Sequence, residues 1–135
     1  MIAYLPVLLQ GTLTTLLLWM GASIISIIFG LTTGTIRSAQ LRIPLLAPIT
    51  DGITLIARGI PLYAQLMIAY FVIPQLTGIS LSPFTTGVLT LGFCSGAYTS
   101  EIIRGALNSV PEGQWLAARV LGYTRWQQLR WIIIP

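Results

Sequence analysis

The sequence contains no histidine and no lysine, and its only cysteine is Cys94. One cysteine cannot form a disulfide within the chain, and transition-metal sites built on histidine or paired cysteines are excluded. Neither a Ser–His–Asp nor a Cys–His catalytic set can be assembled from this chain. A Walker-type phosphate-binding motif is impossible without lysine. We therefore expect no catalytic residue, no metal site and no cofactor, and we interpret Cys94 as a small buried apolar residue.

Charge is also scarce, because 7% of the 135 residues are charged and 55% are hydrophobic. A soluble domain carries about 25% charged residues, which help to cover its surface. The mean hydropathy of this chain is +0.85. These values predict an all-α, polytopic transmembrane protein with a single membrane domain over residues 1–135.

The net charge is +4, and every basic residue is an arginine. A basic balance can indicate nucleic-acid binding, but these arginines adjoin long apolar runs. That placement fits the positive-inside rule of membrane proteins better than a phosphate-binding face. We therefore expect membrane lipid, and no nucleic acid, as a partner.

Three membrane spans are predicted, at roughly residues 9–35, 52–73 and 84–103. The first lies in a charge-free segment from Met1 to Ile36 that is rich in Gly, Ser, Thr and Ala, which favour close packing between helices. Prolines at positions 44 and 48 indicate a loop before the second span. A turn-rich segment between Pro74 and Pro83 separates the second from the third.

The charged residues sort to one side of these spans. The first group, between spans one and two, is Arg37, Arg42, Asp51 and Arg58, and the second, around and after the end of span three, is Arg104, Glu112, Arg119, Arg125 and Arg130. The N-terminus and the loop between Pro74 and Pro83 carry no charge, so we expect the N-terminus outside. The chain ends at Pro135 just as "WIIIP" becomes apolar, and we expect a fragment or a truncated product.

After the third span, residues 104–131 are expected to form a cytoplasmic helix-turn-helix. Pro111 and Glu112 suit the first turn of a helix, and Gly122 suits a left-handed cap at its end. Thr124 and Gln127 have the spacing of a capping box that opens a second helix. The first helix, roughly Glu112–Leu121, is too short to be stable alone in water, so it needs a docking surface.

Two interpretations of this docking surface stay open. The segment can dock on protein, through the small residues Ala117 and Ala118 and the apolar residues Leu116, Val120 and Leu121. Alternatively, it is an amphipathic helix that only lies on lipid, with Trp115, Trp126 and Trp131 at the headgroups.

Residues 116–135 resemble the EAA loop of bacterial ABC importer permeases, which reads E-A-A, three residues, G, nine residues, I-x-L-P. Ala117, Ala118, Gly122, Ile132 and Pro135 match this pattern. Ile134 replaces the usual Leu. Leu116 stands where the family has Glu, so we expect weaker or altered coupling, or a partner groove adjusted to an apolar residue.

Two further blocks are similar to the polar amino-acid branch of these permeases. "ARGIPLYAQLMIAYFVIP" is similar to R-G-T-P-L-x-x-Q-L, with Ile60 at the Thr position. "SGAYTSEIIRGALNSVPEGQ" is similar to S-G-A-Y-x-x-E-x-x-R-G. The resemblance runs from Gln10 over nearly the whole chain, and family members generally have about five core spans.

The resemblance implies a multi-pass subunit of the bacterial cytoplasmic (inner) membrane that moves a polar amino acid or similar small solute by alternating access. It implies three protein partners: an ATP-binding ABC subunit that hydrolyses ATP, a second permease subunit, the same or homologous, and an extracytoplasmic solute-binding protein. The implied ATPase-coupling residues are Glu112, Gly113, Gln114, Leu116, Ala117, Ala118, Gly122, Ile132 and Pro135. The alternative is a non-transporting scaffold or an inactive truncated remnant.

Candidate substrate-pathway residues are the polar side chains on the predicted spans, namely Arg58, Gln65, Ser95, Tyr98 and Glu101. Each also has a structural interpretation. Arg58 reaches the interface or pairs with an acid, Glu101 pairs with Arg104 three residues on, and the other three hydrogen-bond between helices. Gly92 and Gly96 are interpreted as a small-residue packing face.

Overall fold

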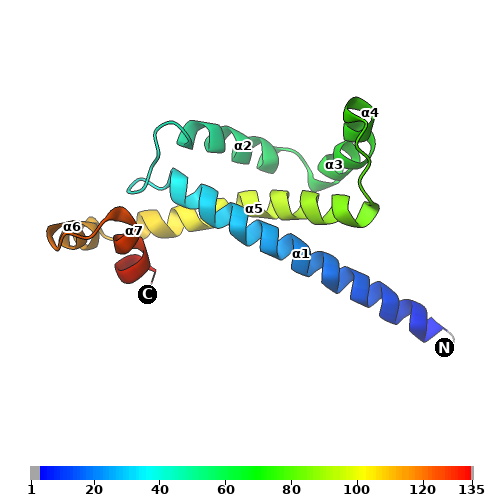
Figure 1. Cartoon of the computed structure of the whole chain (residues 1–135), viewed down its shortest axis with the longest axis horizontal. Helices are drawn as coiled ribbons and strands as arrows, with labels where there is room; N and C mark the ends of the chain where they lie inside the picture. Colours follow the sequence, from blue (N-terminus) through cyan, green and yellow to red (C-terminus); the bar gives the residue numbers. More distant parts are fainter. Residues whose placement is uncertain (1–3, 135) are drawn as a thin grey trace.

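Two long helices, α1 (Leu5–Arg37) and α5 (Pro83–Ser109), pack against each other and form the centre of the molecule (Figure 1). The structure is a computed structural model that describes residues 4–134. The described residues form helices joined by turns and loops, without a strand, which confirms the predicted all-α class. At 1.5 Å per residue, the 33 residues of α1 extend about 50 Å, more than a bilayer's hydrocarbon core needs.

Small residues bring α1 and α5 into close contact. The buried positions of α1 include Ala22, Ser26, Gly30 and Gly34, which recur every four residues. Gly92 and Gly96 of α5 face this stripe, as the sequence predicts. A Cβ atom on Gly96 would lie 2.8 Å from the Phe29 ring, and one on Gly34 would lie 2.7 Å from the Ser100 carbonyl oxygen. The backbones therefore approach more closely than larger side chains permit.

Polar and aromatic contacts join the same two helices. The hydroxyls of Ser26 and Thr99 lie 3.0 Å apart, within hydrogen-bond distance. The rings of Phe29 and Phe93 lie with centroids 5.0 Å apart in a tilted arrangement. A hydroxyl pair is favourable in an apolar surrounding because neither group is left without a partner.

The predicted second span is broken in the structure. Helix α2 (Ala47–Gly59) ends at Ile60, and the chain then turns by 102° into the segment Leu62–Thr77. The break lies at Pro61, which disfavours helical backbone at the residue before it. Helix α2 begins at Ala47, five residues before the predicted start of the span, and Pro48 lies within its first turn, where the missing N–H costs nothing.

The segment after the bend consists of α3 (Leu62–Met67), a π-helical turn η2 (Ile68–Val72) and α4 (Ile73–Thr77). Gly78 ends α4 with φ +73°, a left-handed conformation that other residues disfavour. Ser82 then caps α5, since its hydroxyl accepts from the Thr85 N–H at 3.1 Å. The predicted turn between Pro74 and Pro83 is therefore present.

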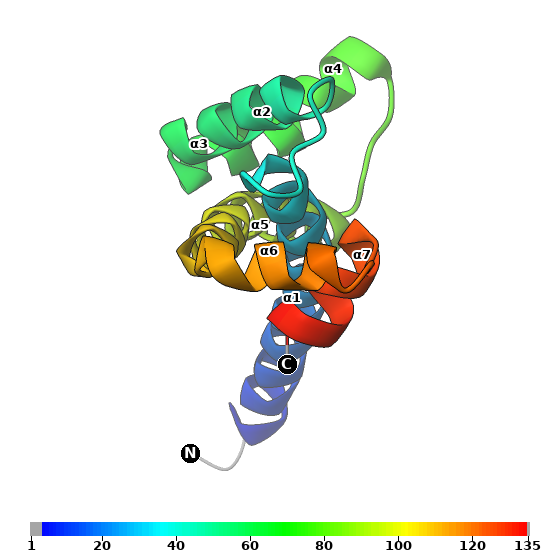
Figure 2. The same cartoon turned by 90° about the vertical axis from the view of Figure 1, so that its left-hand side faces the viewer.

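The C-terminal segment contains α6 (Glu112–Val120), α7 (Arg125–Gln128) and a π-helical turn η3 (Leu129–Ile133). It follows the C-terminal end of α5, and in Figure 2 α6 runs across the end of α5 instead of continuing it. The predicted helix-turn-helix is therefore present at the expected residues.

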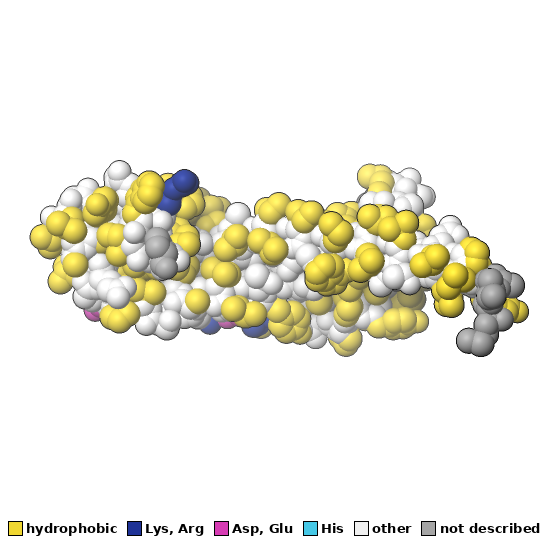
Figure 3. Space-filling view, turned by 90° about the horizontal axis from the view of Figure 1, so that it is seen from below, with side chains coloured by type: hydrophobic (Ala, Val, Ile, Leu, Met, Phe, Trp, Pro, Cys, Tyr) yellow, Lys and Arg dark blue, Asp and Glu magenta, His cyan; other side chains and the backbone are white. Residues whose placement is uncertain are grey.

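Many large apolar side chains are exposed, and on the face that Figure 3 shows the charged atoms lie away from the N-terminal end of α1. By length and composition, α1 qualifies as a membrane span, and α2 with Leu62–Thr77 qualifies as one bent pair. Helix α5 has the length but is not apolar enough by the same measure. The three spans and the outside N-terminus remain predictions.

Candidate functional site

The turn after α6 has the backbone geometry predicted for it. Gly122 has φ +81°, in the left-handed region. Its N–H donates to the Arg119 carbonyl at 3.0 Å, and the Tyr123 N–H donates to the Ala118 carbonyl at 3.2 Å. This pair of bonds is a Schellman motif, which satisfies carbonyls that the helix end leaves free. Gly122 therefore fixes the direction in which the chain leaves α6.

The second helix of the segment begins with the predicted capping box. The Gln127 N–H donates to the Thr124 hydroxyl at 3.4 Å, and the Thr124 N–H donates to Oε1 of Gln127 at 2.8 Å. Gln128 is buried and donates from Nε2 to the Tyr123 carbonyl at 2.7 Å. The turn is thus held from both sides by local hydrogen bonds.

One face of α6 points outward and is apolar. Leu116, Val120 and Leu121 are 57%, 80% and 72% exposed. Ala117 and Gly113 are also exposed. Residues three and four apart share a helix face, so these five residues form a continuous surface, which we call the coupling face.

The opposite side of α6 is buried within the segment. Trp115 and Ala118 are each 1% exposed, and Leu129 of η3 is also buried. Ala118 therefore packs inside the segment and does not lie on the coupling face, and its predicted role in docking stays a prediction. Trp115 cannot reach lipid headgroups either, whereas Trp126 and Trp131 remain exposed.

The remaining predicted coupling residues flank this face. Glu112 and Gln114 are exposed in the first turn of α6, and Ile132 of η3 is half-buried. Pro135 lies outside the described residues.

A second feature is an ionic cluster that joins α1, α2 and α5. Arg37, the last residue of α1, is only 7% exposed. Its Nε donates to Oδ1 of Asp51 on α2 at 2.5 Å, and its Nη2 donates to Oε1 of Glu101 on α5 at 2.6 Å. Its Nη1 donates to the Ser100 hydroxyl at 3.1 Å. One guanidinium therefore ties three helices together through charge-assisted hydrogen bonds.

Glu101 is the centre of this cluster. Arg104 donates to its Oε2 from Nε at 3.0 Å and from Nη2 at 2.7 Å, which confirms the predicted pair. Nη2 of Arg58 lies 3.7 Å from Oε1 of the same carboxylate. The two predicted pathway residues Arg58 and Glu101 are thus brought together, and Arg58 pairs with an acid.

Gln65 braces the bend between α2 and α3. Its Nε2 donates to the carbonyl oxygens of Ala57 at 2.7 Å and Ile60 at 2.8 Å. These carbonyl oxygens lie at the helix end, where no following turn of the helix donates an N–H to them. The Cys94 thiol, which is buried as expected, lies 3.7 Å from the same nitrogen. Gln65 therefore bonds across a helix break and does not lie among the charged residues.

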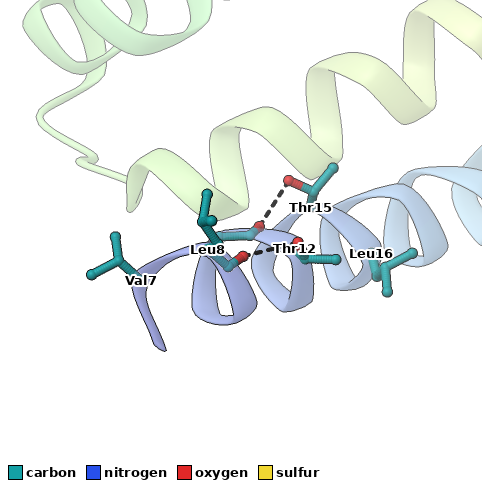
Figure 4. Close-up of a pocket in the computed structure, with 6 residues that line it drawn as sticks. Val7, Leu8, Thr12, Thr15 and Leu16 are labelled. Carbon is teal, nitrogen blue, oxygen red and sulfur yellow. Dashed lines mark hydrogen bonds between the residues drawn. The ribbon is translucent and has the colours of Figure 1, made fainter. Parts of the chain in front are cut away.

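Ser95 and Tyr98 lie apart from the ionic cluster. Ser95 lines a hollow of about 420 Å³ between α1 and α5, together with Ser23 and Ser26. Tyr98 is 52% exposed on α5. A further hollow of about 400 Å³ lies on α1 near its N-terminal end (Figure 4). Its Thr12 and Thr15 hydroxyls donate to carbonyls of their own helix, so they leave no free donor for a ligand.

Sequence reasoning missed Arg37 and Asp51 as members of a site. Both were assigned to a loop by the positive-inside pattern. The scarcity of acidic residues could have indicated this cluster. The chain has three acids, and an acid near an apolar segment needs a cationic partner. Which arginine serves which acid depends on the arrangement of helices, and residues 37 and 101 are far apart in the chain.

Comparison with known proteins identifies one family and several similar permease proteins. Residues 38–135 match the family described as "Binding-protein-dependent transport system inner membrane component". The chain is 37% identical over 135 residues to a putative glutamine transport system permease protein of Rickettsia bellii, covering 95% of this chain and 58% of the relative. It is 36% identical over 134 residues to an arginine transport system permease protein of Bacillus subtilis, covering 99% and 60%.

Solved structures show the same arrangement of helices. An amino acid ABC transporter crystallised with histidines matches with a TM-score of 0.83 and 34% identity, over 100% of this chain and 62% of that chain. The MetNI methionine ABC transporter matches with a TM-score of 0.82 at 20% identity, which supports the fold alone. The chain spans about 60% of the length of the curated relatives.

Proposed function

Because the chain belongs to the family of binding-protein-dependent transport system inner membrane components, we propose that it is a membrane-spanning subunit of an ATP-driven importer of polar amino acids. The relatives' names support this substrate class, since they include glutamine, arginine and histidine/lysine/arginine/ornithine transport systems. A separate ATP-binding subunit would supply the hydrolysis, a second permease subunit would complete the membrane pathway, and an extracytoplasmic protein would deliver the solute.

The observation that carries this proposal is the geometry of α6 and its turn. The coupling face is apolar, exposed and held by a short helix that has little stability of its own. An exposed apolar face of this kind is typical of a surface that a partner protein covers, because the contact removes apolar side chains from water. The EAA-like residues Ala117 and Gly122 lie respectively on this face and at the turn that orients it. We propose that the ATP-binding subunit docks here and transmits its closure to α5 through the start of α6.

The substrate pathway is the second part of the same proposal. Ser95 lines the hollow between α1 and α5, and Ser23 and Ser26 add hydroxyls to it. Small hydroxyl residues suit the passage of a polar solute and equally suit helix packing. Arg58 and Glu101 lie in the ionic cluster, where they would bias movement of α2 relative to α5.

Uptake of labelled amino acids tests the proposal. The chain is co-expressed with a candidate ATP-binding subunit, a second permease subunit and a solute-binding protein, and reconstituted into liposomes. We expect ATP-dependent accumulation of glutamine, arginine or histidine that is lost when the chain is omitted. If the ATP-binding subunit binds the chain but no solute accumulates in any combination, the scaffold alternative is the better account.

A further inference from the structure

The ionic cluster contains more positive than negative charge. Four arginines, Arg37, Arg42, Arg58 and Arg104, lie within 4.0 Å of the two carboxylates Asp51 and Glu101. Four cations less two anions leaves a local charge of +2. In a chain that adjoins lipid, an uncompensated charge is costly unless an anion or water reaches it.

Both carboxylates are already used by other arginines. Glu101 accepts from Arg37 at 2.6 Å on Oε1 and from Arg104 at 2.7 and 3.0 Å on Oε2. Asp51 accepts from Arg37 at 2.5 Å. The 3.7 Å separation between Arg58 and Glu101 is too long for a hydrogen bond of ordinary strength. Arg58 is therefore attracted by the negative charge of Glu101 but makes no hydrogen bond to it.

Arg58 itself is left with unused donors. Within residues 4–134 its guanidinium makes no hydrogen bond, and its Nε is buried without a partner. Its side chain is nevertheless 33% exposed, so a ligand can reach the outer nitrogens. A guanidinium offers five N–H donors in a planar fork that matches a carboxylate or a phosphate group.

The backbone around Arg58 is fixed in advance. Gln65 donates hydrogen bonds to the carbonyl oxygens of Ala57 and Ile60. These two residues flank Arg58 and Gly59 in the chain. Arg58 also lies in the last turn of α2, facing α5 across the cluster. A donor held in place before its ligand arrives loses little freedom on binding.

We propose that Arg58, with Arg104 on the other side of Glu101, forms a binding site for an oxyanion, a carboxylate or a phosphate group, beside the bend between α2 and α3. The anion supplies the charge that the two acids do not. Its source is either a phospholipid headgroup of the surrounding leaflet or the carboxylate of a small free solute. This site follows from contacts of this chain alone and does not depend on the proposed transport function.

The test compares Arg58→Gln with Arg125→Gln. Arg125 is an exposed arginine of α7 and, among the described residues, lies within 4.0 Å of no carboxylate. Both changes remove one positive charge. Arg58→Gln breaks no hydrogen bond of the described structure, so the fold should persist, which circular dichroism checks. Arg58→Lys keeps the charge and loses the fork.

Two probes distinguish the sources. Retention of dioleoylphosphatidylglycerol, against dioleoylphosphatidylcholine, is measured by native mass spectrometry of the purified chain. Binding of free glutamate, against chloride at equal ionic strength, is measured by tryptophan fluorescence in phosphatidylcholine nanodiscs. We expect one probe to bind about tenfold more weakly to Arg58→Gln, with Arg125→Gln unchanged and Arg58→Lys between them.

A loss confined to phosphatidylglycerol assigns the site to a headgroup, and a loss confined to glutamate assigns it to a free carboxylate. Equal losses in Arg58→Gln and Arg125→Gln would show diffuse attraction and overturn the site. Unchanged binding of both probes to Arg58→Gln, or no specific binding by the original chain, would overturn it as well.

Discussion

Arg37 is the residue on which the charged end of the molecule depends most. Its three hydrogen bonds reach Asp51, Ser100 and Glu101 on two other helices. The guanidinium is nearly buried, so its loss would leave two carboxylates without their closest cation. Breaking a buried pair on one side costs more than the pair contributes, because the remaining charge stays desolvated.

We predict that Arg37→Met lowers the free energy of unfolding by about 2 kcal/mol, a value below that of a fully buried pair because Arg58 and Arg104 still neutralise Glu101. Unfolding is measured by titration with dodecyl sulfate in mixed micelles. The control is Arg42→Met, since Arg42 is 58% exposed and 4.0 Å from Asp51. Its cost should stay within about 0.5 kcal/mol. Equal costs for the two variants would show that Arg37 does not tie the helices.

Leu116 is the second residue with a specific consequence, because it puts an apolar side chain on the coupling face where the EAA pattern has an acid. We predict that Leu116→Glu changes the affinity for the ATP-binding subunit by about tenfold, in a direction set by the charge of the partner's groove. Affinity is measured by surface plasmon resonance on nanodiscs. An unchanged affinity would mean that position 116 lies outside the contact.

At the scale of elements, the contact between α1 and α5 depends on positions without a side chain. We predict that Gly34→Leu destabilises the fold by about 1–3 kcal/mol, because its Cβ alone would lie 2.7 Å from the Ser100 carbonyl. The matched variant is Gly11→Leu, since a Cβ at Gly11 meets nothing within 4 Å. Thermal unfolding in detergent checks both, and similar melting temperatures would contradict the close packing.

The bend between α2 and α3 depends on Gln65. We predict that Gln65→Leu loosens the bend, because two hydrogen bonds worth about 1 kcal/mol each are lost. Cys94, the only cysteine, is buried beside Gln65 and reports on the opening through its rate of maleimide labelling. We expect labelling about tenfold faster than in Gln10→Leu, an exposed glutamine of α1. Equal rates would show that Gln65 does not hold the bend.

Local signals in the sequence predicted most of these elements. Gly122, Thr124 and Gln127 define a turn within six residues, and Gly92 with Gly96 define a packing stripe by spacing alone. The bend at Pro61 was missed although proline marks it, because the apolar run continues through it as a span would. Hydropathy reports burial in lipid and is insensitive to a change of direction.

At the scale of the whole molecule, the missing information was which elements meet. The pairing of Arg37 with Glu101 joins residues 64 apart, and no periodicity encodes it. The burial of Ala118 and Trp115 likewise follows from the way η3 folds back under α6. The charge asymmetry, by contrast, follows from the sequence alone, and on the face drawn in Figure 3 the charged atoms lie in the half away from the N-terminal end.

The chain as a whole therefore consists of two closely packed helices, a bent segment beside them and a small helical unit at one end. The ionic cluster connects α1, α2 and α5, and α6 follows directly after α5. A partner that moves α6 would act on the helix that carries Glu101. On the proposed function, this connection would transmit movement of an ATP-binding subunit to the membrane helices.

Co-purification with a candidate ATP-binding subunit tests that connection most directly. The original chain is compared with Ala117→Arg, which places a charge on the coupling face, and with Ala39→Arg, the same change at an exposed loop position. We predict that the original chain and Ala39→Arg retain the ATP-binding subunit through purification and that Ala117→Arg loses it. Retention by Ala117→Arg at the level of the original chain would contradict docking through α6.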